Sequence, residues 1–280
     1  MLGGGGVTGV AWEIGVIAGL AARGVLLSAA DLLIGTSAGS VVGALLAWGA
    51  DPAQLYEEQL RPAPGAGQAG ASAGVDKMKL RDMAIFGWAM LRYPDPARAG
   101  ARIGRMALAA RTGPEARRRE VIAARVPAEE WPARRLLITA VDAVTGEFTV
   151  FTGASGVSLV DAVGASCAVP GVWPPVSMAG RRWIDGGIRS PANADLAADC
   201  ERVVVLAPIP RGMRAASAVA TQAAELTRAG RAVAVVSPDR AAVAAIGRNV
   251  LDPARRAPAA RAGHAQTGTA LDRVGTVWNG

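Results

Sequence analysis

A serine between two glycines is the residue of this sequence whose setting points most directly to chemistry. Gly35, Ser37 and Gly39 form a G-x-S-x-G pattern that follows the apolar run Leu32–Ile34 and precedes a stretch rich in alanine, valine and leucine. This order of strand, turn and helix is typical of a nucleophile elbow, a sharp turn that lifts the serine hydroxyl clear of a sheet. The N–H groups that begin the following helix would favour the negative charge formed during attack on an ester. Ser37 is therefore predicted to be a nucleophile.

A serine nucleophile needs a group that accepts its proton. The single histidine, His264, lies in a stretch rich in arginine and alanine, with no strand before it to hold the ring, so a Ser-His-Asp triad is the less favoured reading. Asp185 ends a short apolar run and is followed by Gly186 and Gly187. Partial desolvation would raise the pKa of this carboxyl and let it accept the serine proton directly. By itself, however, Asp-Gly-Gly is more typical of a turn capped by its aspartate than of a catalytic site.

The chain opens with a loop rich in glycine before a helix predicted over residues 10–22. The glycines of this loop are Gly4, Gly5, Gly6 and Gly9. A glycine loop at a helix N-terminus is a ready site for an anion. The spacing also fits the dinucleotide-binding fingerprint, which requires a full strand before the loop and an acid at the end of the second strand. Only Met1 and Leu2 precede the loop, and Asp31 begins the second strand, so a nicotinamide or flavin enzyme is not favoured.

Three blocks in this order resemble the patatin-like phospholipases: the loop Gly4–Gly9, the elbow Gly35–Gly39 and the motif Asp185–Gly187. A fourth stretch, Ala165–Val176, is similar to the segment that precedes the aspartate motif in that family. The likeness covers roughly residues 1–210.

The resemblance implies a patatin-type three-layer α/β/α sandwich with a mostly parallel central sheet. It implies hydrolysis of a lipid acyl ester through an acyl-serine, with Ser37 as nucleophile, Asp185 as general base and no catalytic histidine. It also implies an oxyanion hole made by backbone N–H groups of Gly4, Gly5 and Gly6. No metal or other cofactor is implied. In this reading Gly9, Gly35, Gly39, Gly186 and Gly187 support the motifs.

Two departures from the family pattern keep an alternative open. Many members carry a lysine or arginine before the last glycine of the first motif, where this chain has Thr8. The first strand, which positions the glycine loop, is nearly absent from the sequence. The alternative is a lipid-binding or regulatory protein that keeps the patatin fold with weak catalytic activity.

Strand-like and helix-like runs alternate along the chain, which is typical of an α/β layered domain. We expect one acyl-hydrolase domain over residues 1–252, with a helical, lid-like insertion at about 76–131. The remaining residues, 253–280, form a tail rich in alanine, arginine and glycine, part of which we expect to be mobile.

Composition and charge limit the kinds of molecule that this protein is expected to bind. The 280 residues carry a net charge of +7, almost all of it from arginine, and contain no recognisable nucleic-acid-binding module. The run Met83–Leu91 is apolar and flanked by basic residues, so it indicates either a lid that touches a membrane surface or a helix pair packed in the core. Cys167 and Cys200 suggest neither a disulfide framework nor a metal site. With no secretory signal visible, the default location is the cytoplasm. The oligomeric state is not indicated.

Overall fold

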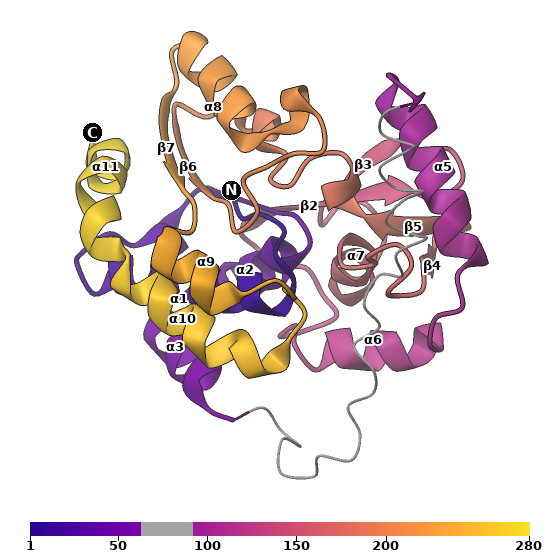
Figure 1. Ribbon diagram of the computed structural model, residues 1–280, viewed down its shortest axis with the longest axis horizontal. Coiled ribbons are helices and arrows are strands. Elements are labelled where there is room, and N and C mark those ends of the chain that lie inside the picture. Colours follow the sequence, from indigo (N-terminus) through magenta and orange to yellow (C-terminus); the bar gives the residue numbers. More distant parts are fainter. Residues whose placement is uncertain (63–91) are drawn as a thin grey trace.

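A central β-sheet with helices on both faces organises the chain (Figure 1). The computed structural model describes residues 1–62 and 92–280. Its strands are β1 (Leu32–Gly35), β2 (Arg135–Asp142), β3 (Phe148–Phe151), β4 (Val176–Met178), β5 (Arg181–Asp185), β6 (Arg202–Leu206) and β7 (Ala232–Val236).

The sheet is mixed, and only part of it is parallel. β1 pairs parallel with β2, and β6 pairs parallel with β7. In contrast, β3 and β5 both pair antiparallel with β2, and β4 pairs antiparallel with β5. Tight turns join β2 to β3 and β4 to β5, and in them Gly146 and Gly180 adopt φ values of 76° and 72° that glycine reaches without strain. The expectation of a mostly parallel sheet therefore holds only for the half that contains β1, β6 and β7.

The short first strand lies in the middle of the sheet. Leu2 forms parallel bridges to Gly35 on one side and to Leu206 on the other, and so links β1 to β6. Its N–H donates to the carbonyl oxygen of Ile34 at 2.8 Å, and its own carbonyl oxygen accepts from the N–H of Thr36 at 3.0 Å. Met1 and Gly3 also bond to β6, so the first three residues take the place of a strand and fix the start of the glycine loop beside the end of β1.

Alternating side chains of the strands pack against different helices. Leu136, Ile138 and Ala140 of β2 join the large cluster under α1, α2 and α7, whereas Val141 packs with residues of α5 on the other side. The helices that cover the first face are α1 (Gly6–Ala21), α2 (Ala38–Ala47), α3 (Pro52–Leu60), α7 (Leu159–Ser166), α9 (Arg240–Ile246), α10 (Arg256–Ala265) and α11 (Thr267–Asn279). On the opposite face lie α5 (Pro96–Ala109) and α8 (Val219–Arg228). This is the expected three-layer α/β/α arrangement.

The C-terminal region is helical and packed, which corrects the expectation of a mobile tail over residues 253–280. Ala259 and Ala260 of α10 are fully buried. A Cβ atom on Gly15 of α1 would lie only 2.1 Å from the carbonyl oxygen of Ala260, so small residues let these two helices approach closely. The indole N–H of Trp12 donates to the side chain of Gln266 at 2.9 Å. Alanine and glycine, which suggested a loose tail, are here the residues of a tight helix contact.

The described part of the expected 76–131 insertion contains two packed helices, α5 and α6 (Glu115–Ala123). Ile103 and Met106 of α5 are buried against Ile184 of β5, and α6 packs against α7. For these residues the core-packed reading applies. The apolar run Met83–Leu91, on which the lid and membrane readings rest, lies outside the described residues.

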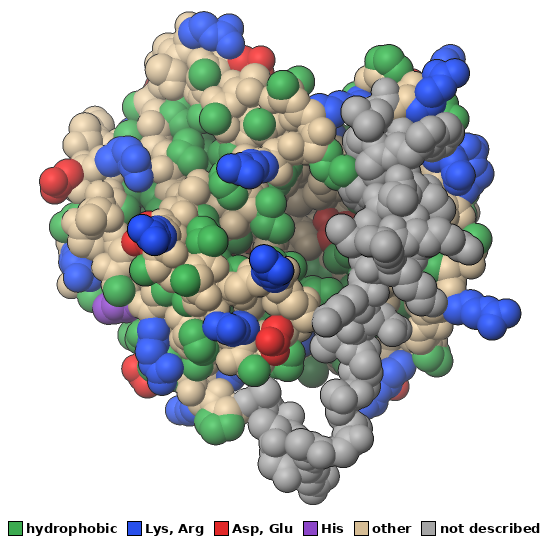
Figure 2. All heavy atoms as spheres, viewed as in Figure 1, with side chains coloured by type: hydrophobic (Ala, Val, Ile, Leu, Met, Phe, Trp, Pro, Cys, Tyr) green, Lys and Arg blue, Asp and Glu red, His purple; other side chains and the backbone are tan. Residues whose placement is uncertain are grey.

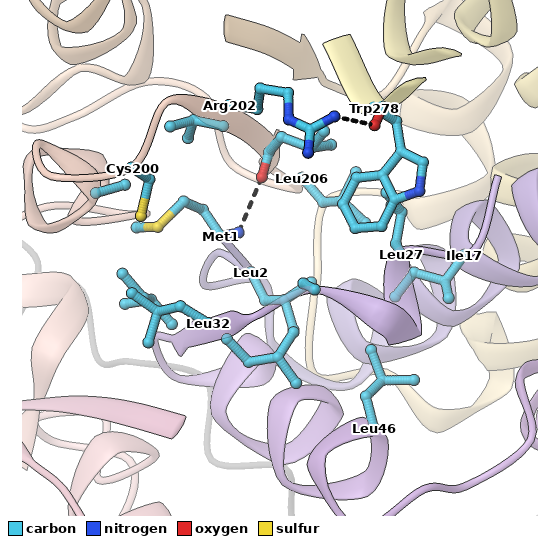
Figure 3. Close-up of a pocket in the computed structure, with 16 residues that line it drawn as sticks. Met1, Leu2, Ile17, Leu27, Leu32, Leu46, Cys200, Arg202, Leu206 and Trp278 are labelled. Atoms are coloured by element: carbon cyan, nitrogen blue, oxygen red, sulfur yellow. Dashed lines mark hydrogen bonds between the residues drawn. The ribbon is translucent and has the colours of Figure 1, made fainter. Parts of the chain in front are cut away.

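No helix within residues 1–62 and 92–280 is long and apolar enough to cross a membrane. A small pocket lies where β1 and β6 begin, walled mostly by leucine, isoleucine and valine side chains together with Trp278 (Figure 3). There the Met1 ammonium group donates to the carbonyl oxygen of Val204 at 2.9 Å. Burial lowers the pKa of this ammonium to about 6. Neither Ser37 nor Asp185 lines this pocket, so it is separate from the site described next.

Candidate active site

Ser37 and Asp185 meet because two strands share one edge of β2. Gly35, the last residue of β1, pairs with Ile138, and Asp185, the last residue of β5, pairs with Ala140. β1 runs parallel to β2 and β5 runs antiparallel, so their carboxyl ends face each other across Thr139 alone. β3 occupies the opposite edge, because it also pairs with Ile138 and Ala140. Residues just beyond both strands are therefore brought together.

The backbone of Ser37 is strained, as an elbow requires. Its φ of 51° and ψ of −116° lie in a region that a non-glycine residue rarely occupies. Hydrogen bonds hold this conformation from both sides. The Ser37 N–H donates to Ser166 Oγ at 2.9 Å, and the Ser37 carbonyl oxygen accepts from Ser40 Oγ at 2.6 Å and from the Cys167 thiol at 3.3 Å. The surrounding structure thus fixes the serine in one geometry.

The end of α7 contacts both members of the pair. Ser166 and Cys167 bond to the backbone of Ser37, and the carbonyl oxygen of Ala168 accepts the N–H of Asp185 at 3.1 Å. Cys167 is buried, and burial raises the pKa of its thiol to about 11, so it stays protonated and can donate. No role was predicted for Ser166 or Cys167 from the sequence. The resemblance of the stretch that begins at Ala165 was the feature that could have indicated one.

Asp185 is buried, with 5% of its surface exposed. One carboxylate oxygen accepts the N–H of Gly187 at 2.7 Å, and the carboxyl group also interacts with the Ser37 side chain. Burial raises the pKa of Asp185 from 3.8 to about 6, while the interactions with Ser37 and Gly187 and the charge of Arg118 act in the opposite direction. A carboxylate with this pKa is a competent proton acceptor near neutral pH. The structure therefore brings the two residues predicted as nucleophile and base into contact.

A buried polar network lies behind the pair. Thr36 Oγ1 and Thr139 Oγ1 are 2.9 Å apart, and the Asn193 side-chain amide donates to Thr36 Oγ1 at 3.0 Å. Asn193 adopts a left-handed conformation with φ of 48°, and its amide also reaches the carbonyl oxygen of Gly186 at 3.4 Å. The network ties the end of β1 to the turn after β5. Its members come from three segments, and nothing in the sequence connects them.

The glycine loop lies beside Ser37. A Cβ atom on Gly4 would be 3.5 Å from the Ser37 Cβ, and Gly39 donates its N–H to the carbonyl oxygen of Gly3 at 2.9 Å. The Gly4 N–H is already bonded to the carbonyl oxygen of Pro191 at 2.7 Å. Among the described residues, the N–H groups of Gly5 and Gly6 have no acceptor. Of the three predicted oxyanion donors, these two remain available in this structure.

Two of the motif glycines are required by close approach of the backbone. A Cβ atom on Gly39 would lie 2.1 Å from the carbonyl oxygen of Leu2, and one on Gly186 would lie 2.3 Å from Thr139 Oγ1. Either substitution would force the elbow or the aspartate turn away from its neighbour. The two glycines therefore set the distance between the glycine loop, the serine and the aspartate.

Two other residues singled out in the sequence lie elsewhere. Thr8, which occupies the position of a cation in many relatives, is buried, and its hydroxyl donates to the carbonyl oxygen of Val250 at 3.2 Å. It therefore anchors the glycine loop to the C-terminal region. The ring of His264 stacks on Tyr56 with 4.8 Å between ring centroids, in the contact between α10 and α3. The carboxyl group that interacts with Ser37 is that of Asp185.

The described residues contain no group of three or more histidine, cysteine, aspartate or glutamate side chains that could hold a metal ion. Figure 2 shows a hollow near the middle of the displayed face, with an acidic side chain visible inside it. Lysine and arginine side chains are scattered over this face and do not gather into one patch.

Comparison with known proteins identifies the family of this chain. A family model described as patatin-like phospholipase matches residues 1–198. The crystal structure of VipD from Legionella pneumophila is similar over 96% of this chain, with 14% sequence identity and a TM-score of 0.46. This chain spans 65% of the VipD chain. A search of the curated proteins gave no match. The match over residues 1–198 shows that the chain belongs to the patatin-like phospholipase family.

Proposed function

We propose that this protein is a serine-dependent lipid acyl hydrolase of the phospholipase A, lysophospholipase or esterase type. Family membership supports activity on lipid acyl esters. The observation that carries the finer proposal is the position of a buried Asp185 beside Ser37, with a pKa raised to about 6. In this reading Ser37 is the nucleophile and Asp185 is the general base.

The reaction proceeds in two halves. Asp185 accepts the Ser37 hydroxyl proton as Oγ attacks the acyl carbonyl carbon, and the same proton then passes to the departing alcohol oxygen. This leaves the acyl group esterified to Ser37. In the second half Asp185 takes a proton from water, the hydroxide attacks the acyl-serine, and Ser37 recovers its proton as the fatty acid leaves. No metal is needed for these steps.

The negative charge on the carbonyl oxygen needs hydrogen-bond donors in both halves. We assign this role to the N–H groups of Gly5 and Gly6, because that of Gly4 already donates to Pro191. These donors begin α1, whose dipole favours an anion at this end. Loss of one such donor in other enzymes lowers kcat by roughly 10²–10³-fold.

The test compares the wild type with Ser37→Ala on a panel of phospholipids, lysophospholipids and neutral acyl esters. We expect a fluorophosphonate probe to label the wild type at Ser37, and we expect Ser37→Ala to lose both labelling and hydrolysis. His264→Ala serves as the control and should keep both, because the His264 ring lies against Tyr56. Full activity of Ser37→Ala would refute the proposed nucleophile.

The alternative is a lipid-binding or regulatory protein with weak activity, which the buried Thr8 and the bonded Gly4 N–H favour. The same panel separates the two functions. If the wild type binds lipid vesicles but neither reacts with the probe nor turns over any ester, the regulatory function is the better description.

A further inference from the structure

Three consecutive arginines in α6 have different surroundings. Arg117 pairs with Glu120 at 2.8 Å, and Arg119 pairs with both Glu129 at 2.8 Å and Asp161 at 2.7 Å. Arg118, between them, has neither an ion pair nor a hydrogen bond to any other described residue. Its neighbours are thus bonded at the surface, whereas its own charge is unpaired within residues 1–62 and 92–280.

Arg118 is also the arginine of this group that turns inward. Its guanidinium carbon lies 4.0 Å from the centroid of the Trp173 ring, and its Nε atom is buried without a hydrogen-bond partner among the described residues. Stacking on an indole fixes the plane of a guanidinium and leaves its N–H groups at the edge free to bind. Burying part of a charged group without a partner costs free energy, and a ligand of opposite charge would offset that cost.

The charge of Arg118 acts on the active site. It lowers the pKa of both Asp185 and the Cys167 thiol, so the guanidinium lies within electrostatic reach of both groups. Trp173 belongs to the segment between α7 and β4, a few residues after Ala168, whose carbonyl oxygen holds the Asp185 N–H. Burial lowers the pKa of Arg118 to about 10, which leaves it charged at neutral pH.

We propose that Arg118, held by Trp173, binds the phosphodiester of a phospholipid substrate while the acyl ester lies at Ser37. A planar guanidinium with free N–H groups matches two oxygens of a phosphate, and a charged acceptor strengthens both hydrogen bonds. The inference rests on the proposed hydrolase function and adds selectivity to it. Arg118 makes the enzyme prefer phospholipids to uncharged acylglycerols.

The kinetic test uses Arg118→Gln with two substrates that share the same acyl chains, a phosphatidylcholine and a diacylglycerol, in the same detergent micelles at pH 8. At this pH Asp185 is ionised, so loss of the nearby charge does not limit the base. We expect kcat/KM for the phosphatidylcholine to fall by about 10–100-fold, mainly through KM, as for loss of charge-assisted hydrogen bonds. Hydrolysis of the diacylglycerol should stay within about threefold of the wild type.

Matched controls come from the same helix. Arg117→Gln and Arg119→Gln remove the same charge from neighbouring positions and should leave the ratio of the two activities unchanged. Arg118→Lys keeps the charge but loses the planar fork, and it should recover only part of the preference. If Arg118→Gln lowers both activities equally, Arg118 acts through Asp185 or the fold, and the proposal is wrong.

A binding measurement keeps the inference testable if turnover is absent. Ser37→Ala and the double variant Ser37→Ala/Arg118→Gln are titrated with a short-chain phosphatidylcholine below its micelle concentration, by calorimetry. We expect at least tenfold weaker binding by the double variant. Equal affinities would overturn the role of Arg118, whereas an unreactive wild type with this difference intact would overturn only the proposed hydrolase function.

Discussion

Asp185 and Glu13 are two buried carboxyl groups with different partners. Asp185 is 5% exposed and Glu13 is fully buried in α1. Burial is the largest cause of a raised pKa for both. Asp185 interacts with the Ser37 side chain, whereas Glu13 accepts the N–H of Gly3 at 2.8 Å. The second oxygen of Glu13 has no partner among the residues that the structure describes.

The comparison teaches that a perturbed pKa by itself does not identify a base. Both carboxyl groups are desolvated, but only Asp185 faces a hydroxyl that can act as nucleophile. Glu13 faces the backbone and holds the start of the glycine loop. We therefore propose a chemical role for Asp185 and a positioning role for Glu13, and the experiments below separate these roles.

The largest expected difference is in turnover. Asp185→Asn removes the proton acceptor and should lower kcat by about 10²–10⁴-fold. Glu13→Gln keeps a carbonyl oxygen for the Gly3 N–H, so its kcat should remain within a few-fold of the wild type. The measurement is steady-state hydrolysis of a short-chain ester. A Glu13→Gln enzyme as inactive as Asp185→Asn would place Glu13 in the chemistry.

A second difference is in stability against pH. The folded-state pKa of Asp185, about 6, lies above its ordinary value of 3.8, so stability from the protonated form is present below pH 3.8 and is lost as pH rises through 6. Asp185→Asn avoids this loss. It should gain up to about 3 kcal/mol over the wild type above pH 6, at 1.36 kcal/mol per pKa unit, with little gain near pH 4.

Glu13→Gln should follow a different curve. Because the pKa of Glu13 is raised well above 4.5, its contribution is lost over a wider range of pH. The gain from Glu13→Gln should therefore start near pH 4.5 and keep rising above pH 6, where that of Asp185→Asn is level. Urea unfolding between pH 4 and pH 8 measures both. If the free energy of unfolding changes with pH in the same way in both variants, burial of Asp185 and burial of Glu13 have the same effect on stability.

The smallest expected effect is on the pH dependence of catalysis. A base with a pKa of about 6 predicts that kcat/KM falls as pH drops through 6, because protonated Asp185 cannot accept the serine proton. Glu13→Gln should keep this midpoint within about half a pH unit of the wild-type value, since the proposed role of Glu13 is to hold the backbone of Gly3 and not to interact with Asp185. The measurement is kcat/KM against pH on an uncharged ester. If Glu13→Gln shifts the midpoint further, the titrations of Glu13 and Asp185 are coupled.

Much of this protein could be read from residue patterns. The apolar run before Gly35 predicted β1, the small residues after Ser37 predicted α2, and the apolar run before Asp185 predicted β5. Even the burial of Glu13 had a signal, because it is the single charged residue among the first 22 and lies in a helix that is apolar all round. Local sequence carries these features, since propensity and periodicity act over a few residues.

Other features depend on contacts between distant segments. No local pattern indicates that residues 1–3 take the place of a strand between β1 and β6, or that Ser166 and Cys167 hold the strained Ser37 backbone. The helical packing of residues 253–280 was also hidden, because alanine and glycine predict a loose tail as readily as a tight helix contact. Whether such a segment is loose or packed depends on the helix that it contacts.

The sequence by itself determined the chemical groups: a serine on a turn, an aspartate before two glycines and a glycine loop before a helix. Contacts between distant segments are needed to place Ser37 and Asp185, far apart along the chain, beside each other. The physical reason is the pairing of β2. Its one edge accepts β1 in parallel and β5 in antiparallel orientation, so both strands end at Thr139 and their next residues meet.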